Sequence, residues 1–148
     1  MTSNIRLLAE EFSSFPSDAS VKKISEQLYQ SSDGGADRHL RNAAAELLAY
    51  GGHPAIEPLT SFLRCEHGVY QLDAAKRAIK SLFIIQGVNA ETVVREQLAS
   101  ILPMMKRLGE AAHNEDARKF VIKSVEAYSA DLVKLIEQIE AEKKAKPR

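Results

Sequence analysis

An internal repeat is the sequence feature that most constrains the fold of this chain. The segment LRNAAAELLAYGG at residues 40–52 aligns with AKRAIKSLFIIQG at residues 75–87, at an offset of 35 residues. Alanines, aliphatic side chains and the final glycine fall at matching positions, and a weaker third copy follows around Val121. Repeats of about 20–50 residues in helical sequence are typical of stacked helix pairs that share one core.

The spacing of apolar residues predicts helices along nearly the whole chain. No run shows the alternation with a period of two that a strand requires, so we expect an all-α fold. A first helix is expected over the apolar face of residues 5–15, and a second is expected to begin after Ser17 as its N-cap. Further helices are expected over roughly 36–50, after Pro54, over 69–86 and after Asn89, which we expect to cap its helix.

The end of the chain is expected to contain two more helices. Pro103 should kink or divide the helix that follows Asn89, and Gly109 should close it. A seventh helix is expected to begin near Asn114, and an eighth to carry Leu132 and Ile139. The sequence therefore predicts seven or eight helices in antiparallel pairs, stacked into a short superhelical α-solenoid.

The buried positions follow from the same pattern. The alanines of the first repeat have small side chains that let a neighbouring helix approach closely. The run SLFIIQG is apolar nearly all round, which predicts burial on two sides. We expect the continuous core to contain these side chains: Leu48, Leu59, Leu63, Leu82 and Phe83.

Composition excludes several classes of protein. The chain has 148 residues, with 20 basic and 20 acidic side chains. A dedicated nucleic-acid binder normally carries a basic excess, so that class is disfavoured. A single cysteine rules out an internal disulfide, and no signal peptide or membrane-length apolar run is visible. We therefore expect a cytoplasmic protein with no membrane association.

The first repeat resembles a known family of repeats. LRNAAAELLAYGG followed by AIEPLTSFL is similar to the HEAT-like repeat, in particular the short variety of bilin-lyase-type proteins. That variety has a small-residue helix, a glycine turn and an Ala-apolar-Glu-Pro-Leu helix, which Ala55, Ile56, Glu57, Pro58 and Leu59 match. The resemblance is best over residues 40–94 and implies an architecture more than an activity.

The resemblance also implies a division of the chain. Residues 1–142 are expected to form one helical-repeat domain, and residues 143–148 a flexible basic tail. Within the domain we expect an N-terminal capping helix pair at 1–35, HEAT-like repeats at 36–94, and a divergent repeat with a C-terminal cap at 95–142.

No set of residues with catalytic, cofactor-binding or metal-binding spacing is visible. Cys65 and His67 are separated by one residue, but a metal site needs three or four ligands at workable spacing. We interpret them as part of a loop with a half-buried thiol, and Met104 and Met105 as core side chains. We therefore expect no catalytic residues, no cofactor and no metal.

The repeat alignment gives one candidate binding surface. Arg41, Lys76 and Lys119 fall at equivalent positions, as do Lys80 and Lys123, and Arg77 lies beside them. All lie opposite the apolar stripes, on helices that face the concave surface in HEAT-like proteins. We expect these six cations to form a ridge that binds an acidic partner, although ordinary solvated helix surface would look the same.

The favoured function is a non-enzymatic scaffold or adaptor module that binds another protein on its concave face. The alternatives are an enzyme or chromophore lyase, by analogy with the bilin-lyase relatives, and a helical repeat that interacts with nucleic acid. The lyase alternative requires a pocket with convergent polar groups. The partner and the oligomeric state are not determined by the sequence.

Overall fold

The computed structural model describes residues 17–29, 35–65 and 67–145. Those residues form helices and no strands, which confirms the all-α prediction. The helix expected over residues 5–15 lies outside the described residues. The α-helices are α2 (Asp18–Glu26), α3 (Gly35–Leu47), α4 (Ile56–Leu63), α5 (Leu72–Gln86), α6 (Glu91–Ala99), α7 (Ile101–Ala111) and α8 (Glu115–Ala145). Short 3-10 segments adjoin them: η1 (Gln27–Tyr29), η2 (Leu48–Tyr50), η3 (His53–Ala55), η4 (Val69–Gln71) and η5 (Gly87–Ala90).

Ser17 is the N-cap of α2, as predicted. The backbone N–H of Ser20 donates to Ser17 Oγ at 3.2 Å, and the backbone N–H of Ser17 donates to Ser20 Oγ at 2.9 Å. This reciprocal arrangement satisfies two backbone donors that a helix start otherwise leaves unpaired. The apolar face of the helix, carried by Val21, Ile24 and Leu28, is buried.

The double glycine between α3 and α4 makes a turn that side chains would not fit. Gly52 has φ +69° and ψ −153°, a region that is almost restricted to glycine. A Cβ on Gly51 would lie 3.2 Å from Val21 Cγ2 and 3.2 Å from the Cβ of Ala55. Pro54 then lies in η3, and Pro58 in the first turn of α4, where a missing N–H breaks no helix bond.

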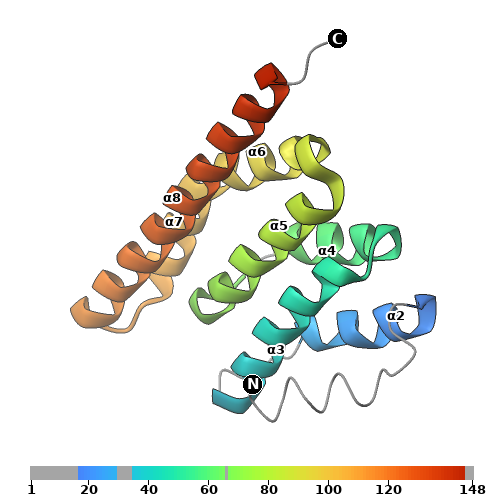
Figure 1. Ribbon diagram of the computed structural model, residues 1–148. Helices are drawn as coiled ribbons and strands as arrows, with labels where there is room; N and C mark the ends of the chain where they lie inside the picture. The colour runs from blue at the N-terminus through green and yellow to red at the C-terminus, as the bar shows by residue number, and fades with distance from the viewer. Residues whose placement is uncertain (1–16, 30–34, 66, 146–148) are drawn as a thin grey trace.

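The helices are arranged in two layers. In Figure 1, α3, α5 and α8 run in roughly the same direction, and α3 contacts α5, which in turn contacts α8. On the other side of this row, α2 contacts α4 and α4 contacts α6. The pairs α2–α3, α4–α5 and α6–α8 join the two layers.

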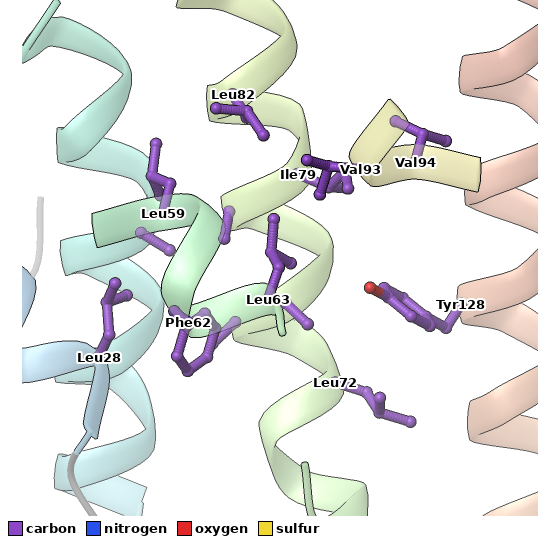
Figure 2. Close-up of a cluster of buried hydrophobic side chains, with 14 of the residues drawn as sticks. Leu28, Leu59, Phe62, Leu63, Leu72, Ile79, Leu82, Val93, Val94 and Tyr128 are labelled. Atoms are coloured by element: carbon purple, nitrogen blue, oxygen red, sulfur yellow. The ribbon is translucent and has the colours of Figure 1, made fainter. Parts of the chain in front are cut away.

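The core lies between these layers, and small side chains bring its helices together. Ala44 and Ala45 on α3 and Ala75 and Ala78 on α5 have no exposed surface, which explains the three consecutive alanines of the first repeat. Ser81 Oγ donates to the backbone oxygen of Ala45 at 2.6 Å, joining the same two helices. Figure 2 shows larger side chains filling the space beside them: Leu59, Phe62, Leu63, Ile79 and Leu82.

One part of the core prediction is wrong. Leu48, Leu59, Leu63 and Leu82 are fully buried, but Phe83 is half-buried. Ile84 is 68 % exposed, so the run SLFIIQG is not buried on two sides. One side of α5 near its C-terminal end is therefore open to solvent at Ile84.

The helix boundaries after Gly87 differ from those predicted. Asn89 lies in η5 and does not cap α6, whose N-cap position is Ala90. The chain is divided at Ser100 because Pro103 has no N–H to donate to the carbonyl of Ala99. Gly109 lies inside α7, which continues to Ala111.

The two helices expected after Asn114 are a single helix. The helix begins after Asn114, as predicted, and Asn114 caps it, with its Oδ1 accepting from the backbone N–H of Ala117 at 2.8 Å. The helix α8 then continues for 31 residues without a glycine or proline. It extends through Ala145, so the first residues of the expected tail are helical, and Lys143 Nζ lies 2.6 Å from Glu91 Oε1.

Candidate functional site

A groove between α5 and α8 brings two of the predicted cations together. Its volume is about 360 Å³, and η4 and α5 form one wall while α8 forms the other. Lys76 lines the first wall and Lys123 the second. We call this site the α5/α8 groove.

Two exposed aromatic side chains lie at the mouth of the α5/α8 groove. The rings of Tyr70 on η4 and Phe120 on α8 are 5.6 Å apart between centroids, at an angle of 38°. The two residues remain 40 % and 46 % exposed, respectively. Exposed aromatic pairs in a concave site provide contact area at a small cost in side-chain entropy, which is why aromatic residues are enriched at protein interfaces.

The charges in the groove are partly paired. Lys76 Nζ lies 3.3 Å from Asp131 Oδ2, and this ion pair joins α5 to α8. Asp73 also lines the groove. No carboxylate of the described residues forms an ion pair with Lys123, which is exposed. Lys123 is therefore the lining cation that is available for an acidic ligand.

Two of the lining residues of the α5/α8 groove belong to the buried core. Leu72 and Tyr128 line it and are almost fully buried. Figure 2 shows Tyr128 reaching from α8 toward core side chains of α4 and α5. Its hydroxyl donates to Gln97 Oε1 at 2.7 Å, and burial raises the pKa of this phenol. The phenol is therefore a fixed, neutral donor.

Arg41 is not on the surface, so its expected place in the exposed ridge is wrong. The side chain has no exposed surface and lies beneath η4, where its Nη2 donates to the backbone oxygen of Tyr70 at 3.4 Å. The prediction failed because the repeat alignment pairs Arg41 with Lys76, which is half-exposed in the structure. In the fold, Arg41 supports the segment that carries Tyr70 and does not reach the solvent.

The other predicted cations lie outside the groove. Arg77 Nε lies 3.3 Å from Glu46 Oε2 on α3, so its charge is paired. Lys80 and Lys119 are exposed, one turn away from Lys76 and Lys123 respectively, and do not line the groove. The structure thus brings Lys76 and Lys123 into one site and leaves Lys80 and Lys119 beside it.

Tyr70, Phe120 and Asp131 were not predicted from the sequence as site residues. Phe120 carried a usable signal, because it falls beside the apolar stripe of Val121 and Val125 and not on it. A large aromatic residue next to a helix stripe, in a chain with few aromatics, predicts an exposed contact residue. Nothing in the sequence placed Tyr70 opposite it.

A second cleft of about 360 Å³ lies between the end of α4 and the helices α6 and α7. His67, Cys65, Arg64, Gln97 and Arg107 are among its lining residues. Cys65 is exposed, whereas the predicted loop had a half-buried thiol, and His67 is only 2 % exposed. Among the residues that the structure describes, no three His, Cys, Asp or Glu side chains converge as metal ligands.

No protein-family profile, curated protein or solved structure matches this chain. Within the described ranges, no helix has the length and apolar character needed to cross a membrane.

Proposed function

We propose that this chain is a non-enzymatic helical-repeat module that binds an acidic segment of another protein in the α5/α8 groove. The observation that carries the proposal is the presence of Tyr70, Phe120 and Lys123 at one concave site. An aromatic pair recognises an apolar side chain of the partner, and a cation beside it recognises a carboxylate.

The arrangement of the helices supports this role. The row of α3, α5 and α8 corresponds to the second helices of the proposed helix pairs, which line the concave surface in HEAT-like proteins. We interpret the two layers as a short solenoid of that type. Such folds offer an extended surface for protein partners, and the groove lies on that row of helices.

The charge around the groove fits an acidic partner. Lys80 and Lys119 are exposed next to the groove, and Lys123 lines it. Exposed lysines act mainly by speeding the encounter with a carboxylate-rich segment, and salt screens this effect over about 8–10 Å. In this proposal the partner is a protein of the cytoplasm.

Selection of short random peptides displayed on phage tests the proposal without a known partner. We expect the selected peptides to be enriched in Asp and Glu around one aromatic or large aliphatic residue. Their affinity, measured by fluorescence anisotropy, should fall roughly tenfold or more in Phe120→Ala, since truncating a central aromatic contact costs about 1–2 kcal/mol or more. Lys123→Glu should slow association, most strongly at low salt.

Two variants on the same helix serve as controls. Ile122→Ala removes a side chain of similar exposure that does not line the groove, and Lys134→Glu reverses an exposed charge elsewhere on α8. Both should bind the selected peptides as the wild type does. Peptides without acidic residues, or peptides that lose equal affinity in all four variants, would contradict the proposal.

A further inference from the structure

The α5/α8 groove also contains a carboxylate that pairs with no cation of the described residues. Asp73 lines the groove from α5 and is exposed. It belongs to none of the ion pairs in the described part of the chain. The guanidinium of Arg77, one turn along α5, donates to the backbone oxygen of Asp73 at 3.3 Å and pairs its charge with Glu46. The carboxylate of Asp73 is therefore available to a ligand.

The opposite wall of the groove presents a charge of the other sign. Lys123 lines the groove from α8 and forms no ion pair with a described residue, Asp73 included. The remaining lining cation, Lys76, is neutralised by Asp131 at 3.3 Å. The groove therefore keeps one anion on the α5 wall and one cation on the α8 wall, and the two do not neutralise each other.

Both charges have the same position relative to the aromatic pair. Asp73 follows Tyr70 by three residues in the run of η4 and α5, and Lys123 follows Phe120 by three residues on α8. Residues three apart lie on one face of a helix. Because α5 and α8 run in roughly the same direction (Figure 1), each charge lies one turn beyond the aromatic residue of its own wall.

We propose that the α5/α8 groove selects a partner segment with one basic and one acidic side chain beside its apolar anchor. The basic side chain pairs with Asp73, the acidic one pairs with Lys123, and the anchor contacts Tyr70 and Phe120. This inference rests on the function proposed for the groove and specifies the charges that its partner must carry.

The two walls reject segments of a single charge sign. A wholly acidic segment gains the contact with Lys123 but brings like charges next to Asp73, and a wholly basic segment meets the converse penalty. Such unfavourable pairs contribute to specificity as much as the favourable ones do. The lysines outside the groove still attract the acidic side chain and its neighbours, so the segment as a whole remains acidic.

Asp73 also has a role within its own helix. It lies in the first turn of α5, where a negative charge favours the helix N-terminus. If this were its sole role, removing the charge would weaken the binding of every peptide alike. Loss of an ion pair with the partner instead weakens only peptides that carry the basic residue.

A binding cycle between Asp73→Asn and two matched peptides tests the proposal. One peptide is a binder selected from the phage library on the wild-type protein, and in the other its basic residue is replaced by glutamine. Fluorescence anisotropy measures both affinities. Each change should weaken binding about two- to fivefold, the range of an exposed ion pair, and both together no more than either alone. Lys123→Gln should show this coupling with the acidic residue of the peptide and not with the basic one.

A control variant and a second selection complete the experiment. Glu137→Gln removes an exposed carboxylate of α8 that does not line the groove, so both peptides should bind it as they bind the wild type. Selection on Asp73→Lys should yield peptides that lack the basic residue.

The outcomes separate this inference from the function on which it rests. Wild-type binders without lysine or arginine, or an equal loss of both peptides in Asp73→Asn, would overturn the inference. The proposed function would still stand if Phe120→Ala weakened those same binders. A library that yields no binder, or full binding in Phe120→Ala, would overturn both.

Discussion

The hydroxyl of Tyr128 on α8 donates to Gln97 Oε1 on α6, and Gln97 Nε2 donates to the backbone oxygen of Leu63 on α4 at 2.6 Å. These two bonds join three helices through polar atoms that are buried. The relay lies between the α5/α8 groove, which Tyr128 lines, and the cleft between α4, α6 and α7, which Gln97 lines. It is one of several polar contacts in a largely apolar core, and its members depend on one another.

Tyr128→Phe should lower the free energy of unfolding by about 1–2 kcal/mol, because it leaves Gln97 Oε1 buried without a donor. Gln97→Leu should cost about 1–3 kcal/mol, since it leaves the phenol of Tyr128 without its acceptor and removes one donor from the Leu63 carbonyl. The double variant should lose less than the sum of the two, as removing both partners leaves fewer unpaired groups. Urea unfolding measures all three, and additive losses would show that the two side chains are not coupled.

Stability should fall as the pH drops from about 6.5 to about 4. Burial lowers the pKa of His67 from 6.5 to about 4, so the unfolded chain binds a proton in this range that the folded chain does not. The contribution of His67 to stability is full above the unfolded pKa and is lost toward the folded pKa. The loss is about 3 kcal/mol for a shift of this size. His67→Gln is the control, and a pH profile identical to that of the wild type would refute the assignment.

Two glycines in different settings, one in the turn between α3 and α4 and one inside α7, give predictions of opposite sign. Gly52→Ala should destabilise the protein by about 1–3 kcal/mol, because φ +69° with ψ −153° strains any residue with a Cβ. Gly109→Ala should stabilise it by about 0.5–1 kcal/mol, since Gly109 is helical and a Cβ there meets nothing within 4 Å. Thermal unfolding of the two variants should move the melting temperature in opposite directions, and a shift of the same sign in both would show that the turn is not as described.

Ala44→Asp should cost several kcal/mol, because it places an unpaired carboxylate where α3 packs against the core. The matched control is Ala130→Asp on α8, where the side chain is exposed and the change should stay within about 0.5 kcal/mol. Circular dichroism melts compare the two. An unchanged melting temperature for Ala44→Asp would mean that Ala44 does not face a neighbouring helix.

Local sequence signals determined the secondary structure. The cap at Ser17, the helix start near Asn114, the stop at Gly87 and the break before Pro103 all act within one helical turn, so they could be located without a fold. The buried alanines of α3 followed from helix periodicity in the same way. Two local signals were misleading, because Asn89 does not cap α6 and Gly109 does not end α7. The expected division of the last helix had no breaker to support it, because α8 contains neither glycine nor proline.

The candidate sites are formed by contacts between residues far apart in the chain, and the sequence pattern does not specify those contacts. Arg41 and Lys76 occupy equivalent repeat positions, yet Arg41 is buried beneath η4 whereas Lys76 pairs with Asp131 on α8. The aromatic pair joins Tyr70 to Phe120, and Arg107 donates to the backbone oxygen of His67, 40 residues away in the chain. Helix periodicity fixes which face of a helix is apolar, because that face must leave water. Which polar side chains meet across neighbouring helices is decided by how the helices stack, because that stacking sets the distances between residues far apart in the chain.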